Sequence, residues 1–135
     1  MYKMTSTDKD TITSLIRDMA SVDNGVPGGR QHMHESCLFV RPSGNPLTPK
    51  QWDEMMNRDD VSITSSKLVS INRLEIIGEM AFACYITHGT FSYKGTENDD
   101  IAVLTSIFRK FGDVWKIVHG QRSTGRSPSD PLPEF

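Results

Sequence analysis

Apolar residues recur at helical spacing near the start of the chain and at alternating, strand-like spacing through its second half. Thr7 can cap a helix whose third residue is Asp10, a carboxylate suited to the positive end of the helix dipole. An apolar stripe follows at Ile12, Leu15, Ile16, Met19 and Val22. The pattern predicts one amphipathic helix that ends at Asn24-Gly25.

A second, short helix and a first strand are expected after the break at Pro27-Gly28-Gly29. We place the helix at about Arg30 to Ser36 and the apolar strand at Cys37 to Arg41. The segment Pro42 to Pro46 contains two prolines and a glycine, which break both periodicities, so it is expected to be a loop.

The start of a third helix is marked by Thr48, a capping residue, followed by Pro49 at the first helical position and Gln51 three residues after the cap. This helix is expected to stop near Arg58. Its inward face carries Trp52, Met55 and Met56.

Four long segments after residue 62 are rich in β-branched and aromatic residues, which is typical of strands. They are Ser65 to Ile77, Met80 to Tyr93, Ile101 to Phe111 and Val114 to Thr124. Short turns at Gly78-Glu79 and Gly112-Asp113 indicate antiparallel hairpins. The connection Lys94 to Asp100 is longer and acidic, so we expect it to be a solvated, mobile loop.

Helices in one block followed by strands in another indicate an α+β fold, in which a long antiparallel sheet curls around the helices on one face. If the helices cover the sheet incompletely, a pocket for a small molecule remains. Residues 1–126 are predicted to form one domain. The proline-rich tail 127–135 is expected to lie on the surface or on a partner subunit.

The composition narrows the classes of partner. The 135 residues include 15 basic and 17 acidic side chains, giving a net charge of -2 and an isoelectric point near 6.0. Such a chain lacks the positive field with which nucleic-acid binders collect phosphates, so no nucleic-acid partner is expected. No apolar run approaches the roughly 20 residues that cross a bilayer, and the first residues do not resemble a secretory signal. We therefore expect a cytoplasmic protein with no membrane partner.

Cysteine and histidine do not suggest a metal or cofactor. Cys37 and Cys84 are flanked by apolar residues and are interpreted as reduced, buried thiols. His32 and His34 would project in nearly opposite directions from the expected short helix, so they could not hold one ion together. No cofactor is expected.

Three stretches of the chain carry a resemblance to a known superfamily. They are Phe39-Val40-Arg41-Pro42-Ser43-Gly44, Gly78-Glu79-Met80-Ala81-Phe82-Ala83 and Trp115-Lys116-Ile117-Val118-His119-Gly120-Gln121-Arg122-Ser123. Together with the order of elements, they resemble the nuclear transport factor 2-like (NTF2-like) superfamily over roughly residues 7 to 126. The resemblance includes its SnoaL-like and ketosteroid-isomerase-like members and the association domain of calcium/calmodulin-dependent kinase II. It implies a cone-shaped, cystatin-like fold and a homodimer paired through the sheet.

The departures from these relatives restrict the chemistry. Arg41 stands where ketosteroid isomerases carry their general base, an aspartate, and a guanidinium cannot abstract a proton. Thr87 and Ser106 stand where the kinase association domain has two of its pocket arginines, whereas Arg122 matches the third. The resemblance implies that Arg122 points into the cone, where it could bind an oxyanion or pair with an acidic side chain.

The last strand leaves two candidates on opposite faces. On an ideal strand His119 and Arg122 point to opposite sides of the sheet, although a bulge would change this. His119 could act as an acid or base near neutral pH, or it could be a structural residue in the sheet or the dimer interface. The expected ligand-binding residues are Arg122, Tyr85, Thr87, Ser106, Trp52 and Arg41.

Three functions stay open on the sequence alone. The first is a module that binds a small organic molecule, possibly acidic, through Arg122. The second is a small isomerase, cyclase or hydrolyase that uses His119 as its acid or base. The third is a dimeric interaction domain without a ligand. Because this fold hosts many activities, whether the chain is an enzyme is left open.

Overall fold

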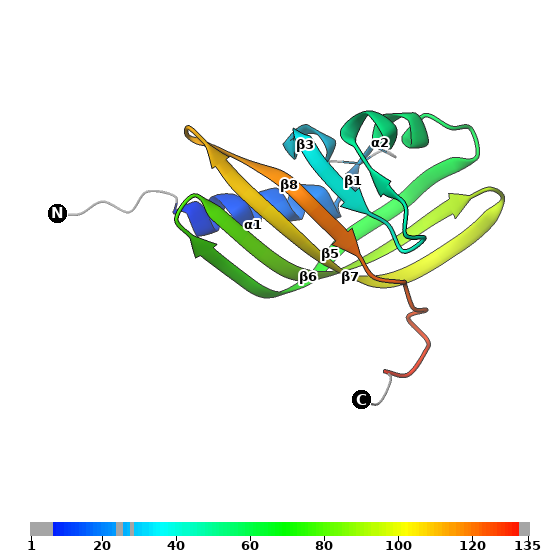
Figure 1. Cartoon of the computed structure of the whole chain (residues 1–135). Coiled ribbons are helices and arrows are strands. Elements are labelled where there is room, and N and C mark those ends of the chain that lie inside the picture. Colours follow the sequence, from blue (N-terminus) through cyan, green and yellow to red (C-terminus); the bar gives the residue numbers. More distant parts are fainter. Residues whose placement is uncertain (1–6, 24–25, 28, 133–135) are drawn as a thin grey trace.

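A single curved sheet with helices against one of its faces makes up most of the molecule (Figure 1). The structure is a computed structural model that describes residues 7–23, 26–27 and 29–132. Its helices are α1 (Asp8–Ala20), the 3₁₀ turn η1 (Arg30–His32) and α2 (Pro49–Met56). This architecture confirms the predicted α+β fold, with a sheet that curves and does not close into a barrel.

The main sheet has six strands in the order β4-β3-β8-β7-β6-β5, and a separate small sheet pairs β1 with β2. The long strands are β5 (Val61–Ile77), β6 (Met80–Tyr93), β7 (Thr96–Phe111) and β8 (Val114–Arg122). The shorter strands are β1 (Val22–Asp23), β2 (Val26–Pro27), β3 (Met33–Val40) and β4 (Pro46–Leu47). All neighbours are antiparallel except β3 and β8, which run parallel, so the sheet is mixed.

Helix α1 begins as predicted and ends earlier. Thr7 and Asp10 form a capping box, in which each side chain accepts a hydrogen bond from the other residue's backbone amide. The apolar stripe is buried at Ile12, Leu15 and Ile16. The helix stops at Ala20, so the prediction that it runs to Asn24-Gly25 was wrong; those two residues lie outside the described part of the chain.

The predicted short helix at Arg30 to Ser36 was also wrong beyond its first turn. Only Arg30–His32 is helical, and from Met33 the chain is already strand β3. The reason is a long-range one: β3 finds a parallel partner in β8, more than seventy residues later in the chain, with Phe39 opposite Gly120. Backbone pairing with a distant strand supplies hydrogen bonds that local periodicity does not reveal.

The acidic segment 94–100 is a strand extension and not the mobile loop that its composition suggested. The turn is confined to Lys94 and Gly95, both with positive φ (51° and 82°), and β7 resumes at Thr96. Two positive-φ residues match the right-handed twist of a hairpin, which lets pairing continue up to the turn. On this extension the Asp99 carboxylate meets the His88 ring at 2.6 Å.

A bulge in β8 determines which residues of that strand face the helices. Ile117 lies opposite Phe108 and His119 lies opposite Ile107, which leaves Val118 as an extra residue. Trp115 and Ile117 are buried in the core before the bulge, and Gly120 is buried after it. The bulge therefore places Arg122 on the same face as the core residues and His119 on the opposite face.

Polar contacts attach α1 to the far end of the sheet. Asp8 Oδ1 accepts a hydrogen bond from the buried Trp115 indole at 3.1 Å and lies 3.3 Å from the Lys110 ammonium. These two donors lower the pKa of the Asp8 carboxyl, the Trp115 bond having the larger effect. A carboxylate in the first turn also suits the helix dipole.

The chain leaves the sheet after Ser123 but returns to it once. Arg126 forms an isolated antiparallel bridge with Ile101, through backbone hydrogen bonds of 2.8 and 2.9 Å. Arg126, the last residue of the predicted domain, thus pairs with β7 although β8 has ended at Arg122. The boundary of the predicted tail at residue 127 stays a prediction.

The capping box of α2 provides a test of this part of the fold. The Thr48 side-chain hydroxyl accepts a hydrogen bond from the Gln51 backbone N–H at 3.2 Å. The Gln51 side-chain oxygen in turn accepts one from the Thr48 backbone N–H at 2.9 Å. We expect Thr48→Ala to lower the free energy of unfolding by about 1 kcal/mol in urea denaturation. Thr48→Ser, which keeps the oxygen, should stay close to the wild type; an equal loss in both variants would contradict the capping role.

Candidate ligand cavity

Two adjoining cavities lie between the inner face of the sheet and the helices. The inner cavity, of about 150 Å³, is lined by residues that include Met19, Tyr85, Thr87 and Leu104. The outer cavity, of about 370 Å³, is lined by residues that include Phe39, Arg41, Met55, Met56 and Tyr93. Both cavities are also bordered by Trp52, Ile63, Phe91 and Arg122. The helices therefore cover the sheet and leave space beneath them.

The apolar wall of the outer cavity comes from α2 and β3. Trp52, Met55 and Met56 line it from α2, on the face that the sequence pattern assigned as inward. The Trp52 ring meets Phe39 of β3 edge-to-face at 5.2 Å between centroids. Such aromatic contacts add about 0.5–1.5 kcal/mol beyond area burial, so they fix the position of the wall.

Gly120 allows Phe39 to lie close over β8. A Cβ at this position would be 2.8 Å from Phe39 Cδ1, which is closer than atoms of this kind approach. Without that Cβ, the Phe39 ring can rest against the β8 backbone. The glycine thus helps to define the outer cavity, a role that its place between His119 and Gln121 did not reveal.

The hydroxyl groups of Tyr85 and Ser106 form a hydrogen bond with each other beside the inner cavity. Both residues are fully buried, and the Tyr85 hydroxyl lies 2.9 Å from Ser106 Oγ and 3.9 Å from the Met19 sulfur. Burial raises the pKa of Tyr85 to about 12, so the phenol is uncharged at neutral pH. Tyr85 and Thr87 line the inner cavity, whereas Ser106 lines neither cavity.

Arg122 stands where the two cavities meet, and it is held loosely. Its guanidinium lies 3.6 Å from the Asp100 carboxylate and 3.5 Å from the Ser123 carbonyl, with its Cζ 5.8 Å from the centre of the Phe91 ring. Two other arginines, by contrast, grip a carboxylate with two hydrogen bonds of 2.7–3.1 Å: Arg30 on Asp53 and Arg58 on Asp60. Arg122 therefore keeps hydrogen-bonding capacity toward the cavities.

Charged and polar side chains also surround the rim of the outer cavity. Arg41, Tyr93 and Asn98 line it, and the Arg41 guanidinium lies 5.8 Å from the centre of the Tyr93 ring. A hydrogen bond from Arg41, and next the charge of Lys94, lower the pKa of Tyr93. Neither Tyr93 nor Asn98 was predicted from the sequence as a cavity residue. The signal for Tyr93 was present, because the alternation that places Tyr85 on the inner face continues to residue 93.

His119 lines neither cavity. It lies opposite Ile107 of β7 and Leu38 of β3, on the outer face of the sheet. The inner and outer faces are separated by the thickness of the backbone, so this imidazole cannot reach a molecule in either cavity.

His32 and His34, the two histidines that were considered as metal ligands, lie apart in the structure. The His32 ring contacts Asp18 of α1 at 3.0 Å, whereas the His34 ring stacks on Phe111 at 4.2 Å. Within the described residues, no group of three or more His, Cys, Asp or Glu side chains is placed to hold a metal ion. Burial raises the pKa of the Cys37 thiol to about 11, which makes it a poor nucleophile at neutral pH.

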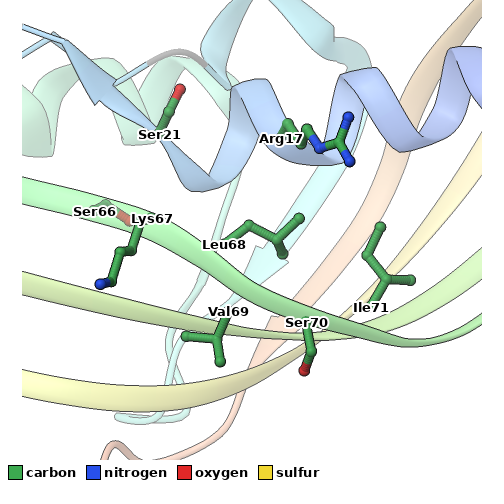
Figure 2. A pocket seen from close by; sticks show the side chains of 8 residues that line it. All are labelled: Arg17, Ser21, Ser66, Lys67, Leu68, Val69, Ser70 and Ile71. Atoms are coloured by element: carbon green, nitrogen blue, oxygen red, sulfur yellow. The ribbon is translucent and has the colours of Figure 1, made fainter.

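A separate groove runs along the edge of the sheet between α1 and β5 (Figure 2). Arg17 and Ser21 border it from the helix, and the bulged stretch from Ser66 to Ile71 borders it from the strand. It has a volume of about 560 Å³ and is open to solvent, with Val69 53% exposed. A concave, mostly apolar site suits a small molecule better, which favours the inner and outer cavities.

Comparison with known proteins agrees with this architecture. Residues 7–130 match the family described as "Protein of unknown function (DUF3804)". A crystal structure of an NTF2-like protein of unknown function from Prochlorococcus marinus is 34% identical, with a TM-score of 0.80, and the match covers 90% of this chain and 95% of that one. The chain belongs to this family of NTF2-like proteins. The suspected superfamily is thereby confirmed.

More distant structures share the NTF2-like fold. An NTF2-like protein from Cytophaga hutchinsonii is 15% identical, with a TM-score of 0.74 over 87% of this chain and 98% of that one. A putative calcium/calmodulin-dependent kinase II association domain from Exiguobacterium sibiricum is 17% identical, with a TM-score of 0.71 over 94% and 100%. No curated protein matches the chain.

The buried Tyr85–Ser106 pair is open to a double-mutant test. We expect Tyr85→Phe and Ser106→Ala each to lower the free energy of unfolding by about 1–3 kcal/mol, because each leaves a buried partner without its hydrogen bond. The double variant should lose less than the sum of the two, as measured by urea denaturation. Additive losses would mean that the two hydroxyls do not depend on one another.

Proposed function

We propose that this NTF2-like protein binds a small organic acid, with the carboxylate at Arg122 and the apolar part in the outer cavity. The observation that carries the proposal is the state of Arg122. It borders both cavities, and its ion pair with Asp100 has a distance of 3.6 Å, whereas Arg30 and Arg58 each hold a carboxylate with two short hydrogen bonds.

The surroundings of Arg122 suit an acid with an apolar body. Its side chain is 22% exposed and rests beside Phe91, so a bound carboxylate would be partly withdrawn from water. A charge-assisted, two-pronged hydrogen bond is strongest in such a setting. The neighbouring wall of Trp52, Met55 and Met56 offers apolar area that adds about 25 cal/mol per Å² buried.

Replacement of Arg122 tests this proposal. In isothermal titration calorimetry with aromatic and aliphatic monocarboxylates, we expect the wild type to bind and Arg122→Met to bind at least about tenfold more weakly. The variant keeps an apolar side chain of similar length, so it removes the hydrogen bonds and leaves most of the packing.

Arg17→Met serves as the matched control, because it removes one positive charge from the groove in Figure 2 and leaves the cavities unchanged. It should bind as the wild type does. If Arg122→Met binds as tightly as the wild type, or if Arg17→Met loses the same affinity, the carboxylate is not held at Arg122.

The geometry does not favour the alternative enzyme with His119 as its acid or base. A general acid or base must lie within hydrogen-bond reach of its substrate, and His119 lies on the face of the sheet turned away from the cavities. Its position on the outer face of the sheet instead favours a role for His119 in a dimer interface.

We also infer that two copies pair through the outer face of the sheet. Register places Phe82, Ile107, His119 and Leu38 in one row across β6, β7, β8 and β3. Leu38 in this row is 41% exposed, and nearby Val103 of β7 is 40% exposed. Exposed apolar area of this kind marks interaction surfaces. The likeness to a kinase association domain suggests oligomeric assembly.

A charge in the middle of this row tests the pairing. The wild type is expected to have the mass of a dimer in size-exclusion chromatography with light scattering, and Ile107→Arg the mass of a monomer, because a buried unpaired charge is costly. Ile76→Arg, at a position 37% exposed on the other face of the sheet, where it lies opposite the buried Ala81, should stay dimeric. A monomeric wild type, or a dimeric Ile107→Arg, would exclude this interface.

A further inference from the structure

A second group of cations lies at the rim of the outer cavity, apart from Arg122. Arg41 and Tyr93 line this cavity. Lys94 is not among the lining residues, but it approaches the Tyr93 ring as Arg41 does, with Arg41 Cζ at 5.8 Å and Lys94 Nζ at 5.4 Å from the ring centre. Arg41 follows the end of β3, and Lys94 occupies the positive-φ turn between β6 and β7. Elements far apart in the sequence thus bring two positive charges and a phenol together.

Within the described part of the chain, the cations of this rim group form no close ion pair, although the charge of Lys94 contributes, after Arg58, to lowering the pKa of the Asp60 carboxyl. Among the described residues, no carboxylate lies within salt-bridge distance of Arg41 or Lys94. The nearby Arg58 is neutralised by Asp60 at 2.8 Å, and Arg122 has Asp100 beside it. Natural proteins usually separate or pair like charges, since unpaired ones repel. Arg41 and Lys94, neither of which is held in a close ion pair by a described residue, are therefore available to bind an anion at this end of the apolar cavity.

We propose that the ligand carries two acidic groups joined by an apolar body, one bound at Arg122 and the other at the rim by Arg41, Lys94 and Tyr93. This inference rests on the proposed function and specifies its ligand class. The outer cavity connects the two positions, because both Arg41 and Arg122 line it. Its aromatic and methionine wall between them would contact the ligand's body.

The donors at the rim suit a carboxylate. Arg41 can offer a two-pronged hydrogen bond, and Lys94 adds a point charge. The Tyr93 hydroxyl can donate one more hydrogen bond, and so can the second N–H of Asn98, whose Nδ2 already donates to the Thr96 carbonyl at 3.1 Å. A monoacid seated at Arg122 would leave these donors to water, whereas a diacid would use both ends of the cavity.

Two matched pairs of acids test the proposal by calorimetry: terephthalate against benzoate, and suberate against octanoate. Within a pair the apolar body is comparable and the number of carboxylates changes. We expect the diacid of at least one pair to bind about tenfold or more tightly than its monoacid, because one added charge-assisted hydrogen bond supplies such a factor. Arg41→Met should abolish this preference, whereas Arg17→Met should keep it.

The outcomes separate the two proposals. If the monoacids bind through Arg122 and neither diacid binds more tightly, the second position is excluded while the proposed function stands. A preference that persists in Arg41→Met also excludes it. If none of the four acids binds, the proposed function fails and this inference fails with it.

Tyr93 supplies a readout besides affinity. The absorbance titration of wild type minus Tyr93→Phe isolates this phenol, whose surroundings include the charges of Arg41, Lys94 and Arg58. A second carboxylate at the rim adds negative charge, so the diacid should shift the titration of Tyr93 to higher pH. Benzoate should leave it unchanged. No shift with a tightly bound diacid would place the second carboxylate elsewhere.

Discussion

The bulge at Val118 is the constraint on which the site depends. One extra residue in β8 lets Trp115 and Ile117 fill the core and then places Gly120 and Arg122 on that same inner face. In a regular strand, residues 117 and 122 would point to opposite sides. Without the bulge, Arg122 would lie on the outer face of the sheet and His119 on the inner face. A single backbone irregularity therefore sets the chemistry of the cone.

Buried polar side chains elsewhere in the fold have hydrogen-bond partners, in contrast to the cations at the cavities. Tyr85 pairs with Ser106 and the Trp115 indole with Asp8, and no described buried side-chain nitrogen or oxygen lacks a hydrogen bond. Such matching is what folding requires, since each unmatched buried group costs free energy. Among the described residues, Arg122 has a carboxylate only at 3.6 Å and Arg41 has none within salt-bridge distance, which is why we propose these two cations as ligand-binding groups.

Many of the elements followed from local pattern. The capping boxes at Thr7 and Thr48 set the starts of α1 and α2, and β6 runs from Met80 to Tyr93 as the alternation indicated. Predictions from local sequence pattern were wrong where pairing with a distant strand determined the secondary structure. Residues 33–36 look helical in isolation but belong to β3, which pairs with β8 at Met33 and again from Leu38 to Val40. The acidic segment 96–100 looks like a loop but pairs with β6. Pairing energy from a remote segment outweighs weak intrinsic preference.

The sequence by itself determined the fold class and the inward stripe of α2, because periodicity is a local property. Arg122 was singled out by the resemblance of the last strand to the kinase association domain, and its role as a ligand-binding residue stays a prediction. Three features were decided by the tertiary structure alone. They are the face of the sheet on which His119 lies, the hydrogen bond between Tyr85 and Ser106, and the contact of Arg41 with the Tyr93 ring. Those features depend on register, and a shift of one residue turns every later side chain to the other face of a sheet. Register is set by contacts across strands, which a linear pattern does not contain.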